Sequence, residues 1–395
     1  MISLSRYSRL LAQPHLKTTV VASVIGRLPV GIASLAILLL TQEQSGSFAR
    51  AGATTAAYVV GLAGIAPFIG RLIDRRGPGA ILRACGTLYP TALGGLASAI
   101  MAGLPMWLVL PLAAAAGATF PPITVCMRTF LKRRLGDDAL LATAYSLESV
   151  LIESLFILGP MLVGAFVAMG SAVWAVAFAA VCGTFGTWLF LRTPPLLHWH
   201  IEPRRASSVF GPLGEHHFLR VLGVVLCYSL AFGLVEIGTT AFATEAGEPA
   251  FAGELLALMS IGSALGGLVY GSRHWRIPLE RQFAVVLGVM SLGIAPLTLI
   301  SALWLFAPFA VVAGIVMAPA LTIQSMLVAQ AAPSEHSTEA FTWSATALLA
   351  GIALGVAAGG VLLEAGTSRL VLGAASGSAF AGALVAGLAL SHLHK

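Results

Sequence analysis

The sequence predicts an all-helical integral membrane protein with twelve transmembrane helices. The chain has 395 residues, of which 58% are hydrophobic and only 10% are charged, and its mean hydropathy is +0.92. Soluble domains carry about 25% charged residues, and a chain with so few could not cover its apolar surface in water. The composition therefore excludes a disordered chain, a nucleic-acid-binding protein and an ordinary cytosolic enzyme, and leaves a protein that crosses the bilayer many times.

Twelve apolar stretches are long enough to cross, because a transmembrane helix needs about 20 residues. The expected helices cover residues 18–41, 51–70, 80–102, 105–128, 139–168, 171–191, 218–243, 252–271, 282–300, 303–331, 338–363 and 369–391. With twelve crossings, eighteen of the 22 Lys and Arg residues fall on one side of the membrane. Basic loops remain in the cytoplasm, so both termini are expected there.

The order of glycines indicates an internal duplication. Gly52, Gly61 and Gly70 recur at a constant offset as Gly253, Gly262 and Gly271, and Gly159 and Gly164 recur at another offset as Gly355 and Gly360. Six helices copied in the same direction predict two similar halves related by an axis along the membrane normal. We expect an N-terminal six-helix bundle over 1–191, a polar cytoplasmic linker over 192–217 and a C-terminal six-helix bundle over 218–395.

A short motif follows the second expected helix. Residues 70–77 read Gly-Arg-Leu-Ile-Asp-Arg-Arg-Gly, which resembles the Gly-x-x-x-Asp-Arg-x-Gly loop signature of the major facilitator superfamily. The resemblance implies that fold over the whole chain, a monomer and a bacterial inner (plasma) membrane. It also implies a gating cluster of Gly70, Asp74, Arg75 and Gly77 that latches the outward-facing state. Asp74 would cap a helix N-terminus in the other half, and Arg75 would hold a carboxylate.

A second element lies in the fifth expected helix. Gly159-Pro160-Met161-Leu162-Val163-Gly164 is similar to the Gly-Pro-x-x-Gly-Gly element of the exporter (drug and sugar efflux, proton antiporter) branch of that superfamily. Pro160 removes a backbone hydrogen bond, and Gly159 and Gly164 permit close helix packing. We expect this stretch to form a seam against the opposite half; a plain proline kink with small-residue packing is the alternative.

Five charged residues fall within the expected helices, where each is costly unless it faces a cavity or a partner. They are Arg27, Arg128, Glu148, Glu153 and Glu236. We expect Glu153 or Glu236 to exchange a proton while Arg27 supplies the counter-charge or holds an anionic substrate. Glu148 is expected to pair with Arg128. Static ion pairs that only fix the packing are the alternative.

Polar and aromatic side chains at mid-helix are candidates for a substrate cavity, although each of them could also simply pack. They are Tyr58, Phe120, Tyr228, Gln324 and Trp343. The sequence gives no metal-ligand spacing, no cofactor motif and no phosphate-binding loop with a lysine, so neither a metal, a cofactor nor direct use of ATP is expected.

These observations predict a secondary active transporter that moves a small organic solute by alternating access, with proton-coupled efflux preferred. The partners would be that solute, protons and the lipid bilayer, and no nucleic acid. A proton-coupled importer of a sugar, amino acid or carboxylate is the nearest alternative, and a membrane sensor that keeps the fold without transporting is a further one. A membrane enzyme would need a nucleophile or metal cluster at the membrane face, which the sequence lacks.

Overall fold

The computed structural model describes residues 4–197, 199, 211–248 and 251–390, and this part of the chain is helical without a strand. Its first helices are α1 (Leu4–Leu11), α2 (Leu16–Arg27), α3 (Pro29–Ser45), α4 (Phe48–Arg76), α5 (Pro78–Met101), α6 (Met106–Ala118), α7 (Ile123–Arg134), α8 (Asp138–Ala168), α9 (Val173–Leu191) and α10 (Pro194–Leu197). The remaining elements are η1 (Gly211–Gly214), α11 (His216–Glu245), α12 (Phe251–Gly271), α13 (Leu279–Ile294), η2 (Ala295–Thr298), α14 (Leu303–Gly314), α15 (Met317–Ala331), η3 (Ser334–His336), α16 (Ser337–Ala365) and α17 (Ser368–Leu390).

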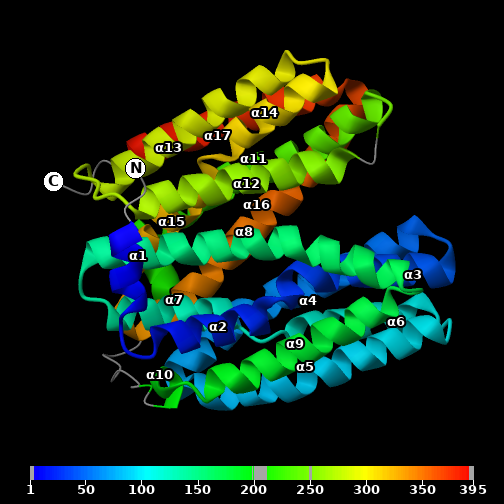
Figure 1. Cartoon of the computed structure of the whole chain (residues 1–395), viewed down its shortest axis with the longest axis horizontal. Coiled ribbons are helices and arrows are strands. Elements are labelled where there is room, and N and C mark those ends of the chain that lie inside the picture. The colour runs from blue at the N-terminus through cyan, green and yellow to red at the C-terminus, as the bar shows by residue number, and fades with distance from the viewer. Residues whose placement is uncertain (1–3, 198, 200–210, 249–250, 391–395) are drawn as a thin grey trace.

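The helices form two groups (Figure 1), the N-terminal half from α1 to α10 and the C-terminal half from α11 to α17. Two long helices make most of the connection between them. α8 of the N-terminal half packs on α12 and α15, while α16 of the C-terminal half packs on α4 and α7. Residues 198 and 200–210, within the expected linker, lie outside the described residues.

Eleven segments of the described chain are long and apolar enough to span a bilayer. α5 is not among them, because Arg83, Thr87, Tyr89 and Thr91 make it more polar. It nevertheless has 24 residues, about 36 Å of helix, and it packs lengthwise on α6 and α9. The fold is therefore consistent with the expected twelve crossings, of which eleven meet the criterion of length and composition.

Several expected helices are broken where proline stands. The stretch expected as one helix over 18–41 divides at Leu28 into α2 and α3, with Pro29 as the first residue of α3. The stretch over 105–128 divides into α6 and α7 around Pro121 and Pro122. Proline lacks the N–H that a helix interior needs, so each helix stops before it; a new helix starts at Pro29 itself and directly after Pro122.

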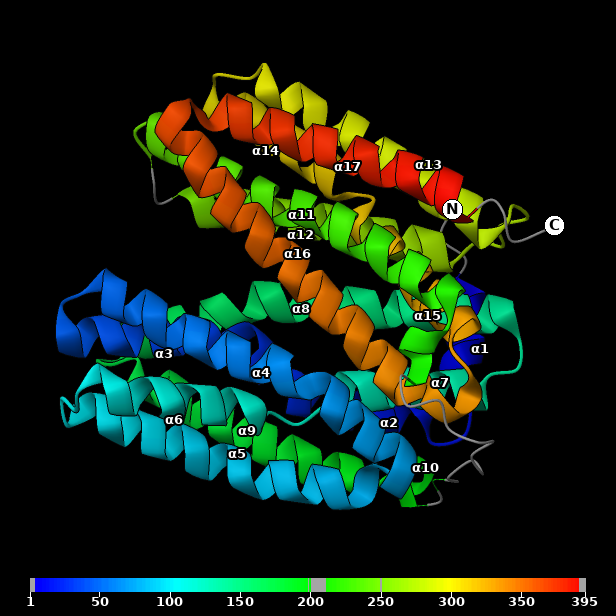
Figure 2. The ribbon, with the colours of Figure 1, turned by 180° about the vertical axis from the view of Figure 1, so that it is seen from behind.

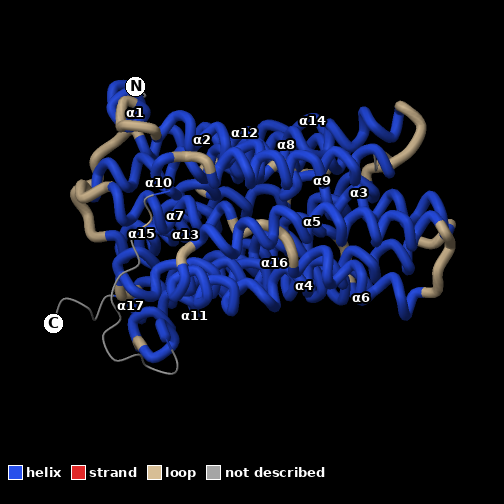
Figure 3. Tube along the Cα trace, turned by 90° about the horizontal axis from the view of Figure 1, so that it is seen from below, coloured by secondary structure: helices blue, strands red, loops and turns tan. Residues whose placement is uncertain are grey.

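Both ends of the described chain lie at the same end of the molecule. α1 and the last turns of α17 both lie at this end in two opposite views (Figures 1 and 2), and the long helices run from it to the other end, with loops gathered at both (Figure 3). We call it the terminal end. The C-terminal ends of α4 and α7 and the first turn of α16 lie there too.

The duplication expected from the glycines reappears as packing. In the N-terminal half, a Cβ on Gly61 would strike the carbonyl oxygen of Ala114, and a Cβ on Gly117 would strike that of Tyr58. In the C-terminal half, the same relation joins Gly262 to Val311 and Gly314 to Met259. Two helix pairs, α4 with α6 and α12 with α14, are thus held in backbone contact by equivalent glycines.

Candidate functional site

The two halves meet at the terminal end around the buried carboxylate of Asp74. Its Oδ1 accepts a hydrogen bond from the backbone N–H of Thr338 at 3.1 Å, and its Oδ2 accepts one from the N–H of Glu339 at 2.8 Å. These two N–H groups belong to the first turn of α16, where helical N–H groups lack partners within the helix. Asp74, in the last turn of α4, therefore caps a helix of the opposite half, which the positive end of the helix dipole favours.

Two glycines of the motif make this contact possible. A Cβ on Gly70 would collide with Thr342 and Glu339, so only glycine lets α4 approach α16 at this depth. Gly77 ends α4 with a φ of 77°, a conformation that costs glycine little. The chain then turns directly into α5 at Pro78.

The expected role of Arg75 is wrong, because its side chain is exposed and no ion pair to a described residue involves it. Arg71 takes that place. Its Nε and Nη2 donate to Oε1 of Glu339 at 2.9 and 2.6 Å. Arg71 stands three residues before Asp74 and so shares its helix face, whereas Arg75 is rotated away from it.

α7 adds two more cations to this contact. Nζ of Lys132 donates to the carbonyl oxygen of Ala332 at 3.0 Å and to Oγ of Ser337 at 3.1 Å. Nη2 of Arg133 lies 3.9 Å from Oδ1 of Asp74. Arg71 and Lys132 of the N-terminal half thus bind the C-terminal half directly at this end.

A second seam, with donors and acceptors exchanged, joins α8 and α1 to the last turns of α12. Here hydroxyls of the N-terminal half donate to backbone carbonyls of the C-terminal half: Thr143 to Gly271 at 2.8 Å, Tyr7 to Leu268 at 3.0 Å, and Ser146 to Gly267. Burial raises the pKa of Tyr7 above the ordinary phenol value, so its hydroxyl retains the proton that it donates. In the first seam, an acid at the end of α4 caps a helix of the opposite half. In the second seam, the N-terminus of α8 is already capped by Asp137 of its own half, so no acid at the end of α12 is needed for that role.

Toward the middle of the molecule the polar contacts between the halves become fewer. Ser149 meets Thr322 at 3.3 Å, Ser263 donates to Glu153 at 2.8 Å, and Thr346 donates to the carbonyl oxygen of Ala63 at 3.1 Å. Within the described residues, no hydrogen bond or ion pair joins the halves nearer the opposite end. The polar seams are therefore confined to the terminal end and the middle.

A buried ion pair lies within the N-terminal half. Nη1 and Nη2 of Arg27 contact the two carboxylate oxygens of Glu148 at 2.6 and 3.1 Å, and Nη2 also reaches Oγ of Ser23 at 2.8 Å. Arg27 is 0% exposed and Glu148 is 1% exposed. The expected pair of Glu148 with Arg128 is therefore wrong: the carboxylate is already held by the two-pronged guanidinium of Arg27, the stronger geometry.

Arg128 lies on α7 about one turn inward from Lys132 and is 7% exposed. Its carbonyl oxygen accepts a hydrogen bond from the Tyr145 hydroxyl at 3.1 Å. Its guanidinium makes no hydrogen bond or ion pair with any described residue, and Nε is sealed from solvent without a partner. Glu148, Tyr145, Arg27 and Tyr228 are the titratable groups close enough to influence it.

The two expected proton carriers differ in environment. Glu153 on α8 is partly buried and hydrogen-bonded across the halves to Ser263, whose hydroxyl also accepts from the backbone N–H of Ala318 at 2.9 Å. Glu236 on α11 is exposed, and none of the described residues donates to its carboxylate.

The five aromatic and polar candidates divide between the halves. The hydroxyl of Tyr58 lies 3.3 Å from that of Tyr89, whose ring meets Phe120 edge to face at 5.4 Å. In the C-terminal half, the Tyr228 hydroxyl donates to Gln324, and Nε2 of Gln324 donates to Ser344 at 2.7 Å. The indole N–H of Trp343 is buried without a partner among the described residues. Tyr58 and Phe120 are therefore not brought together with Tyr228 and Gln324 by any contact.

The expected seam on α8 is not formed against the opposite half. Gly159 packs on the backbone of Gly31 in α3, inside its own half. Pro160 and Gly164 are exposed, and nothing lies within 4 Å of a Cβ placed on Gly164. The reason is that the halves contact each other nearer the terminal end and leave this part of α8 unpaired.

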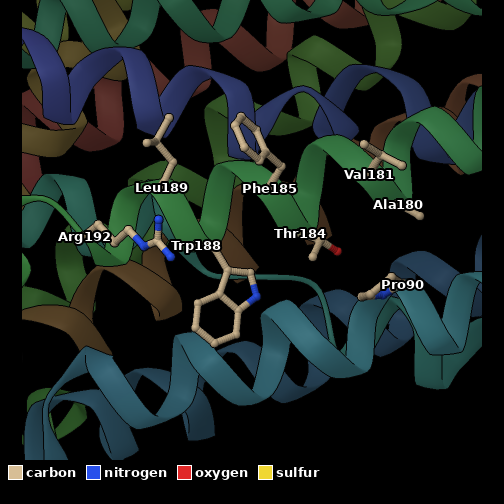
Figure 4. A pocket seen from close by; sticks show the side chains of 8 residues that line it. All are labelled: Pro90, Ala180, Val181, Thr184, Phe185, Trp188, Leu189 and Arg192. Atoms are coloured by element: carbon tan, nitrogen blue, oxygen red, sulfur yellow. The ribbon is translucent and has the colours of Figure 1, made fainter.

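A groove outside this site lies in the N-terminal half. It runs over α5 and α9, has a volume of about 510 Å³ and is almost entirely apolar apart from Arg192 and Thr184 (Figure 4). Over the described residues, no group of three His, Cys, Asp or Glu side chains is placed to hold a metal ion.

Several residues of the site were missed by sequence reasoning: Arg71, Lys132, Ser263 and Glu339. Arg71 carried a usable signal, since it lies within the 70–77 motif, and so did Glu339, an acid in the first turn of α16. Ser263 carried none, because a serine in an apolar helix is common and its partner Glu153 lies 110 residues away.

No protein-family model and no curated protein sequence matches the chain. Solved structures do. The bacterial homologue of the iron transporter ferroportin in an outward-facing state has 13% identity and a TM-score of 0.76, covering 94% of this chain and 98% of that one. The human organic anion transporter MFSD10 has 16% identity and a TM-score of 0.73, over 94% and 99%. The fucose:proton symporter FucP of E. coli has 12% identity and a TM-score of 0.69, over 95% and 99%.

FucP is described as a major facilitator superfamily transporter. At such low identity the likeness concerns the fold alone, but it extends over nearly the whole of each chain. Two helical halves, glycine-packed helix pairs and a capped helix between the halves thus lead to one conclusion: the chain has the fold of major facilitator superfamily transporters.

Proposed function

We propose that the chain is a secondary active transporter that moves a small organic solute by alternating access of its two halves. The observation that carries the proposal is the placement of the seams. Every polar contact between the halves among the described residues lies at the terminal end or in the middle, and each is a surface contact between helices that can be broken without unfolding either half.

The basic residues assign the terminal end to the cytoplasm. With that orientation we propose that the structure represents the outward-facing state, with 1–191 and 218–395 as the rocking bundles and 192–217 as the cytoplasmic linker. In the inward-facing state the Asp74 and Thr143 seams would open, and the α8 stretch with Pro160 and Gly164 would close against the C-terminal half.

Proton coupling is assigned to Glu153, with Glu236 as a second candidate. Glu153 lies where α8 meets α12, so a change in its charge alters a contact between the halves. Burying Glu153 in the low-dielectric contact between the halves costs less free energy when its carboxyl group is protonated than when it is charged. Arg27 does not serve Glu153 as the counter-charge, because Glu148 occupies it.

The Gly159-Pro160 element favours export in exchange for protons. Import together with protons, as in a symporter, uses the same carboxylates in the same fold, and the direction of the coupled proton flux distinguishes the two. We propose a monomer in the bacterial inner membrane with both termini in the cytoplasm, acting without a cofactor and not as an enzyme.

The test uses purified protein in proteoliposomes with an imposed pH gradient and a pH-sensitive dye inside. Substrates found by thermal shift should move protons with the wild type, and Glu153→Gln should abolish pH-driven accumulation while exchange of labelled for unlabelled substrate continues. Glu254→Gln, at an exposed carboxylate at the start of α12, is the matched control. Full coupling in both Glu153→Gln and Glu236→Gln would refute the assignment, and the absence of transport of any compound would refute the function.

A further inference from the structure

The buried charges of the N-terminal half do not balance. Arg27 and Glu148 neutralise each other through two short contacts of 2.6 and 3.1 Å. Arg128, 7% exposed, is left with a full positive charge. A guanidinium remains protonated in proteins, so Arg128 cannot remove its charge by releasing a proton.

Three other buried or partly buried carboxylates already have partners other than Arg128. Asp74 is held by two N–H groups of α16, Glu339 by Arg71, and Glu153 by Ser263. None forms an ion pair with Arg128 in the described part of the chain. Its Nε–H is also buried without an acceptor. A buried charge and a buried donor left without partners are both costly, which indicates that an anion absent from the protein itself completes the site.

The position of Arg128 suits a transported anion better than a structural one. It lies about one turn inward from the contacts of Lys132 that close the terminal end. The hydroxyl of Tyr145 in α8 donates to the carbonyl oxygen of Arg128, and the ring of Tyr145 meets that of Phe341 in α16 at 6.0 Å. α7 itself packs on α16 of the opposite half. Arg128 therefore stands where both halves converge, directly behind the closed end.

We propose that the substrate is an organic anion whose carboxylate, sulfonate or phosphonate group pairs with the guanidinium of Arg128. This rests on the proposed function and names its substrate class. The planar fork of arginine matches such groups with two parallel hydrogen bonds. Tyr228 of the C-terminal half interacts electrostatically with Arg128 and begins a polar chain through Gln324 to Ser344, so an anion bound here would lie between the two halves.

Substituting Arg128 should have opposite effects on stability and on anion binding. Arg128→Gln removes an uncompensated buried charge, so the ligand-free protein should unfold at the same temperature as the wild type or higher. The same substitution should weaken binding of anions by about tenfold to a hundredfold, the worth of a charge-assisted hydrogen bond. Arg128→Lys, which keeps the charge but loses the fork, should lose less.

The experiment measures binding by thermal shift, and exchange in proteoliposomes, with three matched pairs of probes: benzoate and benzamide, benzenesulfonate and benzenesulfonamide, glutarate and glutaramide. Inorganic sulfate against chloride at equal ionic strength provides a pair without an organic part. Arg75→Gln, at an exposed arginine of the same end, is the control. The anionic member of at least one pair should stabilise the wild type and Arg75→Gln but not Arg128→Gln.

Three outcomes would overturn the inference: stabilisation by the neutral members alone, undiminished anion binding in Arg128→Gln, or a clear loss of ligand-free stability in Arg128→Gln, which would reveal a structural partner. Exchange of neutral compounds with an unaffected Arg128→Gln would leave the transport function standing and remove only the anion. No exchange of any compound would instead remove the transport function.

Discussion

The carboxylate of Asp74 at the end of α4 accepts a hydrogen bond of 2.8 Å from the backbone N–H of Glu339, 265 residues away in the first turn of α16. Together with the bond from Thr338, this contact fastens the N-terminal half to a main-chain element of the C-terminal half. It lies beside the Arg71–Glu339 ion pair, so one turn of α16 receives both a carboxylate and a guanidinium from α4.

Removing the acid should loosen the terminal end. Loss of a helix cap costs about 0.5–2 kcal/mol, so Asp74→Ala should shift the ratio of closed to open terminal ends by about 2- to 30-fold. Distances between spin labels at Arg75→Cys and Ser334→Cys, in a background without the four native cysteines, would report that shift as a longer component.

The control is Arg76→Ala, which changes an exposed side chain of the same turn and should leave the distribution unchanged. An Asp74→Ala distribution identical to the parent would show that the cap does not hold the end shut.

The Arg71–Glu339 pair should respond to a charge exchange. Arg71 is 31% exposed, and partly exposed ion pairs contribute about 1 kcal/mol or less. Arg71→Glu places two carboxylates together and should favour the open end, while the double variant Arg71→Glu, Glu339→Arg should recover part of the closed population. The same spin-label pair measures both; failure of the second substitution to recover anything would mean that position 339 acts only through its backbone.

The Arg27–Glu148 pair should matter far more for stability. Breaking a fully buried pair leaves an unpaired charge and costs about 3–5 kcal/mol. Glu148→Gln should therefore lower the unfolding midpoint strongly, because two buried arginines would then lack a carboxylate. The double variant Arg27→Met, Glu148→Met should be much less destabilised, and denaturant unfolding in a mild detergent compares the three proteins. Equal midpoints for Glu148→Gln and the wild type would contradict the assignment.

The glycine contacts of the two halves should be equivalent in energy. A methyl group on Gly117 or Gly314 would overlap a carbonyl oxygen of the neighbouring helix, and overpacking typically costs about 1–3 kcal/mol. Gly117→Ala and Gly314→Ala should lower stability by similar amounts. Gly64→Ala, where nothing lies within 4 Å, should be neutral or slightly stabilising, since alanine is the better helix former.

The helices, their duplication and the gating motif follow from sequence patterns, because hydrophobic length and repeated glycines are properties of the chain itself. The pairing of charges does not follow as directly, since it depends on how each helix is rotated. The depth of each charge along its helix would have predicted the correct pair. Counted from the terminal end, Arg27 lies about 17 Å along α2 and Glu148 about 15 Å along α8, whereas Arg128 lies only about 9 Å along α7. Matching depths points to the Arg27–Glu148 pair that the structure contains.

Conformation is a second property that the sequence does not carry. The α8 stretch with Pro160 and Gly164 was expected to contact the opposite half, yet it is exposed here. Under the proposed alternating access, the chain encodes contacts for two states, and a single structure displays one set. The Asp74 seam is formed, so the contacts that require its opening are absent.

The carboxylate of Asp74 binds backbone N–H groups, so its hydrogen bonds do not depend on which side chains the two donor residues carry. Substitutions of Thr338 other than proline would keep the hydrogen bond to Asp74 as long as the turn stays helical. A substitution of Asp74 by a residue without a carboxylate would remove both hydrogen bonds. The Asp74 contact therefore constrains one acidic side chain in the N-terminal half and only the helical backbone of Thr338 and Glu339 in the C-terminal half, while the side chain of Glu339 is constrained separately by its ion pair with Arg71.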